Sequence, residues 1–137
     1  MTYYAVIDTN VLVSAMLKAD SIPRQILNAV FNNELIPLLC NEIIDEYREV
    51  LARPKFKFDQ KAVRTVVDGL IECCEFLEPE HTDEKIPDPK DVVFYEVALE
   101  GRKKFNDAYL ITGNTKHFPI KHFVVTPREM QTIIYGK

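Results

Sequence analysis

Acidic and amide side chains recur along this chain of 137 residues at points where separate elements are expected to meet. Ligands that are all oxygen, without His or Cys, favour Mg²⁺ or Mn²⁺ over zinc. Carboxylates that converge on one point repel one another, and a divalent cation removes that conflict. Such ions activate water and stabilise developing charge in phosphoryl transfer. The candidate ligands are Asp8, Glu46, Asp88, Asp91 and Asn114, with Thr9 and Asn10 as supporting residues.

Asp8 follows the short apolar run 3–7, which is typical of a strand that is buried on both faces. A carboxylate at the end of such a strand lies at the carboxyl edge of the sheet, where open α/β folds bind ligands. A helix-capping role for Asp8 is about equally compatible with this position. Asn10 fits either role, because it can bond the turn or orient a carboxylate.

Glu46 falls on a helix that the sequence predicts from an N-cap at Asn41 to about Ala52. At about 100° per residue, Glu46 lies at the border of the apolar stripe of this helix, beside Val50. The other acids of the helix, Glu42, Asp45 and Glu49, point away from that stripe. Glu42 is expected on the opposite helix face from Glu46, so replacing it should have little effect. A carboxylate at the border of a buried face needs a partner, and partial exposure is the alternative.

Asp88 before Pro89 has the pattern of a helix N-cap with proline at the first helical position. This pattern puts Asp91 at the third helical position. Capping and the helix dipole explain both acids structurally. Asp91 also lies on the same stripe of the helix as apolar residues. Asp88 is therefore the better candidate for the helix cap, and Asp91 is the better candidate for a metal ligand. Asn114 follows Gly113 at the end of a later strand and is placed at the same sheet edge as Asp8, with an ordinary turn residue as the alternative.

These candidates are positioned by alternating short apolar runs and helical patterns. The expected strands are 3–7, 35–40, 107–112 and 123–126, and the expected helices are 11–17, 21–32, 41–52, 59–74, 88–104 and one from Pro127. Strands separated by helices imply crossover connections and a parallel sheet between helical layers. We therefore predict one domain over 1–137, an α/β/α sandwich with about four to five strands. Asp107 opens its strand, so it is excluded from the site.

Composition sets further limits on function. The chain is 47% apolar and 28% charged with a net charge of −4, as in an ordinary soluble protein. Basic residues gather between Arg48 and Arg64 and acidic residues between Glu75 and Asp91, although solvated faces explain such charges equally well. Three cysteines and three histidines show no metal-ligand spacing and are interpreted as free thiols and surface residues. We expect no signal peptide, no membrane span and a cytoplasmic protein.

The order of these motifs resembles that of the PIN-domain nucleases. The matching residues are Asp8-Thr9-Asn10-Val11, Glu46-Tyr47, Asp88-Pro89-Lys90-Asp91 and Thr112-Gly113-Asn114. The stretch Arg53-Pro54-Lys55-Phe56 is similar to a branch of toxin components of bacterial toxin–antitoxin systems, related to VapC toxins. The resemblance covers nearly the whole chain, and the joint order of the motifs carries it.

The resemblance implies a Mg²⁺- or Mn²⁺-dependent ribonuclease. Asp8, Glu46 and Asp91 would be the catalytic, metal-binding acids, with Asp88 as an accessory acid. Asn114 would occupy a fourth position at which family members often have Asp. The implied partners are an RNA substrate, an antitoxin protein and a second copy of the chain in a homodimer. The candidate RNA contacts are Arg53, Lys55 and Lys116.

Two other readings remain open. A catalytically weak PIN-like module that binds RNA or protein is compatible with Asn114 and with the net negative charge. A phosphatase or receiver-like domain also places an Asp after its first strand. A dehalogenase-type phosphatase, however, needs an acid where Asn10 stands, and a receiver needs an early pair of adjacent acids that this sequence lacks.

Overall fold

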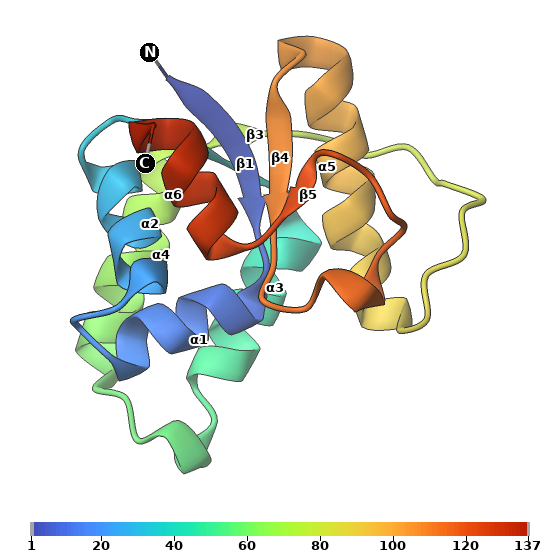
Figure 1. Ribbon diagram of the computed structural model, residues 1–137. Helices are drawn as coiled ribbons and strands as arrows, with labels where there is room; N and C mark the ends of the chain where they lie inside the picture. The colour runs from blue at the N-terminus through green and yellow to red at the C-terminus, as the bar shows by residue number, and fades with distance from the viewer. Residues whose placement is uncertain (1, 137) are drawn as a thin grey trace.

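The computed structural model describes residues 2–136 and is a three-layer α/β/α sandwich (Figure 1). Its parallel strands are β1 (Tyr3–Ile7), β2 (Leu35–Leu39), β3 (Glu75–Phe76), β4 (Ala108–Ile111) and β5 (Val124–Val125). They form one sheet in the order β3-β2-β1-β4-β5. The predicted fold class is therefore confirmed, with β1 in the centre of the sheet.

Helices cover both faces of this sheet. They are α1 (Thr9–Leu17), α2 (Ile22–Phe31), α3 (Asn41–Leu51), α4 (Gln60–Cys73), α5 (Val92–Phe105) and α6 (Pro127–Tyr135). Single 3₁₀ turns form η1 (Pro54–Phe56), η2 (Pro89–Asp91) and η3 (Thr115–His117). Helix α5 packs on β1, β2 and β4, whereas α2 and α6 lie together on the other side of the sheet (Figure 1).

The strands form where the sequence is apolar enough to be covered on both faces. Ala5, Val6 and Ile7 of β1 are fully buried, as are Leu110 and Ile111 of β4. The four predicted strands are all present. Strand β3 was not predicted, because it has only two residues and both are exposed at the edge of the sheet. A pattern of hydrophobicity cannot reveal a strand that buries no side chain.

Predicted caps are confirmed at two of three helix starts. The Asp59 side chain accepts a hydrogen bond from the Lys61 amide, and the Asp88 side chain accepts one from the Lys90 amide. The prediction that Asn41 caps α3 is wrong, because Asn41 is already the first helical residue and Cys40 holds the N-cap position. Strand β2 runs almost directly into α3, so there is no separate turn for Asn41 to cap.

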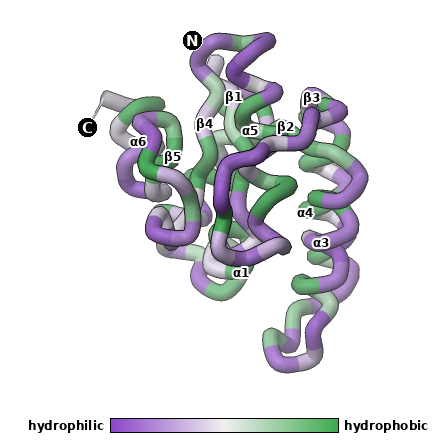
Figure 2. The backbone as a smooth tube through the Cα atoms, turned by 90° about the vertical axis from the view of Figure 1, so that its right-hand side faces the viewer, coloured by the Kyte–Doolittle hydropathy of each residue, from purple (hydrophilic) through white to green (hydrophobic). Residues whose placement is uncertain are grey.

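A long connection leads from β3 to η2 and is hydrophilic over most of its length (Figure 2). Polar contacts fix it to α5. The buried carboxylate of Glu96 accepts a hydrogen bond from the Thr82 amide at 2.8 Å and lies 3.0 Å from His81 Nδ1. The Tyr95 hydroxyl donates to Glu84 at 2.8 Å. These contacts set where the chain arrives at Asp88 and Asp91.

Candidate active site

Strands β1 and β4 end side by side at the carboxyl edge of the sheet. Ile7 pairs with Ile111, and the Asp8 amide donates a hydrogen bond to the Ile111 carbonyl at 2.9 Å. This pairing brings Asp8 next to Thr112, whose hydroxyl donates to Asp8 Oδ2 at 2.7 Å. Asp8 does occupy the N-cap position of α1, but its side chain makes no capping hydrogen bond. Its carboxylate is directed across the sheet edge, so the capping alternative does not explain it.

Helix α3 brings Glu46 to the same edge. The Thr9 hydroxyl donates to Glu46 Oε2 at 2.9 Å. The neighbouring Tyr47 is buried, and its hydroxyl donates to the Ile7 carbonyl. Burial raises the pKa of Tyr47 well above its ordinary value, so this hydroxyl stays protonated as a donor. Glu46 is half-buried, as its place at the border of the apolar stripe predicted.

Turn η2 supplies Asp88 and Asp91. Asp88 acts as the predicted cap and is exposed. Asp91 is half-buried at the last position of the turn, and its Oδ2 lies 3.6 Å from His117 Nδ1. A separation of 3.6 Å is longer than a hydrogen bond, so this is an electrostatic contact.

These acids line one small polar hollow of about 210 Å³. The residues that line it are Asp8, Thr9, Asn10, Glu46, Val50, Arg53, Asp88, Lys90 and Asp91. Within residues 2–136, no three acidic, histidine or cysteine side chains lie close enough together to form a ready-made metal cage. The hollow thus collects four acidic and two basic residues without locking the acids around one point.

The acids nevertheless influence one another electrostatically. Burial raises the pKa of Asp91 to about 6, and the carboxylates of Asp8, Asp88 and Glu46 add to the rise. Burial also raises the pKa of Asp8, and Glu46 adds to this rise, while hydrogen bonds from Thr112 and the Thr9 backbone oppose it. The repulsion among these groups makes the hollow attractive to a cation.

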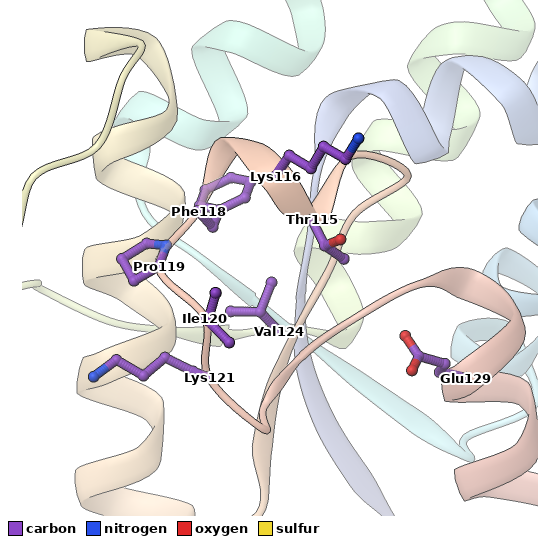
Figure 3. Close-up of a pocket in the computed structure, with 8 residues that line it drawn as sticks. All are labelled: Thr115, Lys116, Phe118, Pro119, Ile120, Lys121, Val124 and Glu129. Atoms are coloured by element: carbon purple, nitrogen blue, oxygen red, sulfur yellow. The ribbon is translucent and has the colours of Figure 1, made fainter.

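Three other predicted site residues lie outside this hollow. Asn114 is exposed and does not line it, and its side-chain nitrogen lies 3.0 Å from His117 Nε2. The Lys55 ammonium lies over the Phe56 ring, 5.0 Å from its centre. Lys116 lines a different hollow of about 520 Å³ with a mainly apolar wall, in which Glu129 is the single acid (Figure 3). Of the predicted RNA contacts, Arg53 alone lines the acidic hollow.

The expectation that Glu42 lies on the far side of α3 from Glu46 is wrong. Both glutamates line a neighbouring hollow of about 470 Å³, which they share with Lys90 and Glu96. The physical reason is simple, because residues four apart lie on the same side of a helix. Glu42 is therefore unsuitable as a distant control, whereas Asp45 is exposed and lines none of these hollows.

Sequence reasoning missed several residues of the site. Thr112 is fully buried against Asp8, and its position opposite Asp8 could have been inferred from the pairing of two strand ends. Lys90 lines the hollow, although the sequence pattern around Asp88 and Asp91 indicates no role for it. His117 was interpreted as a surface residue. No spacing signal in the sequence connects His117 with Asp91, since the fold brings them together.

A family model of the PIN domain matches residues 4–116. The chain belongs to the PIN-domain family. The matched part of this PIN domain runs from β1 into η3 and includes every residue that lines the acidic hollow. Strand β5 and helix α6 lie beyond it. No curated protein and no solved structure matches the chain.

Membership of this family bears directly on the chemistry of the hollow. PIN domains are typically nucleases and generally use divalent metals. The family match therefore supports a nuclease-type activity for this chain. None of the helices described is long and apolar enough to cross a membrane.

Proposed function

We propose that this PIN domain is a divalent-metal-dependent ribonuclease that hydrolyses phosphodiester bonds of RNA. The observation that carries the proposal is the hollow at the carboxyl edge of the sheet, which is lined by carboxylates that follow β1, lie on α3 and begin and end η2. The raised pKa of Asp91, about 6, supports it: burial is the main cause, and the neighbouring carboxylates add a repulsion that a bound cation would relieve. This assignment agrees with the nuclease character of the family.

The donor chemistry of the hollow fits Mg²⁺ or Mn²⁺, which prefer oxygen ligands. Mg²⁺ usually keeps several waters and is bound through one or two carboxylates. A hollow whose acids are not preassembled into a cage can provide that kind of site. Asp8 and Asp91 would hold the ion, with Asp88 as an accessory acid, which leaves the Glu46 carboxylate for the attacking water. When bound, the ion supplies stabilisation of the charge that develops on the reacting phosphate.

The other roles in catalysis and substrate binding would belong to residues of the chain itself. Glu46 would orient the attacking water and accept its proton, and the Thr9 hydroxyl would hold this carboxylate in place. The water oxygen forms the new bond to phosphorus as the bond to the departing ribose oxygen breaks. Arg53 and Lys90 lie at the same hollow and would bind the phosphate oxygens of the strand.

We further propose that the protein is the toxin component of a type II toxin–antitoxin system in the cytoplasm. The support is the resemblance of the stretch 53–56 to that branch of the family. An antitoxin partner and a homodimer are expected on the same ground. Growth arrest on expression of the wild type, absent with Asp8→Asn, is the result expected, and growth unaffected by an active ribonuclease would contradict the toxin role.

A catalytically weak module that binds RNA or protein is the second candidate. It is favoured by the amide of Asn114 at the position where relatives often carry an acid, and by acids that are not gathered into a cage. Such a module would bind single-stranded RNA but leave it intact in Mg²⁺ or Mn²⁺.

One experiment separates the two candidates. Single-stranded RNA is incubated with the wild type, Asp8→Asn, Asp91→Asn and Asp45→Asn, in Mg²⁺, in Mn²⁺ and in EDTA. We expect cleavage in either metal, none in EDTA, a loss of at least about 100-fold in the first two variants and unchanged activity in Asp45→Asn. Cleavage that survives Asp8→Asn would overturn the proposed site, and RNA bound but uncut by the wild type would favour the weak module.

A further inference from the structure

Asn114 is connected to the site by two chains of polar contacts. Its backbone amide donates to the Thr112 hydroxyl at 3.0 Å, and that hydroxyl donates to Asp8 Oδ2 at 2.7 Å. Its side-chain nitrogen lies 3.0 Å from His117 Nε2, and His117 Nδ1 lies 3.6 Å from Asp91 Oδ2. One residue outside the hollow is thus connected to two of the acids that line it.

The chemistry of each contact fixes its direction. As the Asn114 amide is oriented in the structure, its nitrogen faces His117 Nε2 and donates to it, so Nε2 accepts and carries no hydrogen. A neutral imidazole has a single N–H, which then belongs to Nδ1 and faces Asp91. In the same way, the Thr112 oxygen accepts from the Asn114 amide, which leaves the hydroxyl hydrogen for Asp8.

The turn that carries His117 is well anchored. The His117 amide donates to the Asn114 carbonyl at 3.1 Å, and the following Phe118 is buried in the core. The imidazole itself is 49% exposed, so packing alone does not fix its ring. The Asn114 side chain supplies the contact that orients it.

We propose that Asn114 and His117 are positioning residues, in which the Asn114 amide holds the neutral His117 ring with its hydrogen on Nδ1, directed at one oxygen of Asp91. That contact keeps the other oxygen of Asp91 available to the hollow. At 3.6 Å this contact is longer than a hydrogen bond, and polar contacts in an unliganded site often shorten when the ligand is bound. Asn114 thereby acts through His117 and is not itself a ligand of the cation. The consequence for metal binding rests on the proposed function, whereas the state of the His117 ring does not.

The ring is tested directly by the ¹⁵N chemical shifts and the one-bond and long-range proton couplings of its two nitrogens, in the neutral state and without metal. We expect a hydrogen on Nδ1 in the wild type. In Asn114→Asp the donor becomes an acceptor, so the hydrogen should move to Nε2. A wild-type ring with its hydrogen on Nε2 would overturn the proposal, and so would a ring that does not respond to Asn114→Asp.

Mn²⁺ affinity, measured by electron paramagnetic resonance on the intact protein, tests the consequence. Asparagine places an amide near the position of Nδ1 and glutamine near that of Nε2. His117→Gln should therefore weaken Mn²⁺ binding roughly tenfold, the lower end for groups that orient a metal ligand. His117→Asn should stay within about threefold of the wild type, because it keeps a donor toward Asp91.

A double-mutant cycle separates a positioning role from direct ligation. If Asn114 acts through His117, Asn114→Ala should weaken Mn²⁺ binding in the wild type but add little in a His117→Ala background. Equal losses in both backgrounds would show that Asn114 is an independent ligand and overturn the proposal. If the wild type binds no Mn²⁺, the proposed function fails, and the nitrogen shifts still decide the state of the ring.

Discussion

Neutral hydroxyl groups hold two of the three central acids. Thr112 donates to Asp8 and Thr9 donates to Glu46, at 2.7 and 2.9 Å. A carboxylate has about four lone-pair sites, so one hydroxyl leaves it with acceptor capacity to spare. Because the donors are neutral, they orient the acids without cancelling the negative charge that a cation needs.

Replacing Thr112 by valine tests this arrangement. The variant removes the hydroxyl that lowers the pKa of Asp8 and leaves the Asn114 amide without its acceptor. We expect a loss of about 1.5–3 kcal/mol in the free energy of unfolding, the range for a hydrogen bond to a charged group. Urea unfolding measures it. A variant as stable as the wild type would show that the Asp8–Thr112 contact contributes nothing to the fold.

The raised pKa of Asp91 predicts how stability depends on pH in the metal-free protein. The folded protein holds this proton up to about pH 6, whereas the unfolded chain releases it near the ordinary aspartate pKa of 3.8. Between these values the folded state binds more protons at Asp91, so the contribution of this group to stability is largest below the lower value and is lost as pH rises through 6. Asp8 shifts in the same direction.

Urea unfolding in EDTA at a series of pH values checks this prediction. The wild type should lose stability from about pH 4 to 6, and Asp91→Asn should flatten that part of the curve. Added Mn²⁺ should reverse the loss, because the cation binds the ionised acids. A wild-type curve that rises over this window would contradict the electrostatic interpretation of the hollow.

At the scale of the single element, helix α5 approaches the sheet closely at Gly101. A Cβ at this position would overlap Leu38 Cδ1 and lie 3.1 Å from Ala108 Cβ. Both neighbours are fully buried and have little room to move. The close approach matters for function, because the first turn of α5 continues from η2 and its acids.

Two glycine-to-alanine variants form a matched pair. Gly101→Ala should cost about 1–3 kcal/mol, the range for overpacking in a core. Gly69→Ala on α4 meets the ring of Phe31 at 2.7 Å, but that side chain is 43% exposed and can turn away. We expect Gly69→Ala to be near neutral, since alanine is the better helix former by about 0.8–1 kcal/mol. Thermal unfolding that ranks the two variants in the opposite order would contradict this view of α5.

Elements were predictable from the sequence to the extent that they bury a regular pattern. The apolar run 3–7 forms β1 and the apolar stripe predicted for α4 lies on a helix, as expected. On α3, Glu46 borders the apolar stripe and is the acid of this helix that lines the acidic hollow. Strand β3 and the start of α3 were not predictable, since one buries no side chain and the other has no separate cap. The position of Glu42 relative to Glu46 could have been predicted from helix geometry alone, but the prediction made for it was wrong.

At the scale of the whole molecule, the site exists because the carboxyl ends of the strands and the helix starts meet at one sheet edge. That edge was predictable from the alternation of strands and helices. The contacts of Thr112, Lys90 and His117 were not, because each depends on how distant segments are packed together. Oligomeric state, antitoxin binding and location in the cytoplasm stay predictions.

Net charge gives this molecule no general attraction to RNA, since the chain carries −4 overall. Attraction must come from local cations, and Arg53 and Lys90 stand beside the acids. Beyond Arg53, the loop that contains η1 projects from the body of the molecule (Figures 1 and 2). RNA held mainly by these few cations should show a shallow dependence of affinity on salt.

The most direct measurement is a crystal structure of the protein soaked in Mn²⁺, with the ion located by its anomalous scattering. We predict a peak in the hollow, roughly 2.0–2.2 Å from carboxylate oxygens of Asp8 and Asp91, with water completing the shell and Asn114 outside it. Crystals in which manganese avoids this hollow, while Asp8, Glu46 and Asp91 keep their metal-free positions, would contradict the proposal of a metal-dependent nuclease.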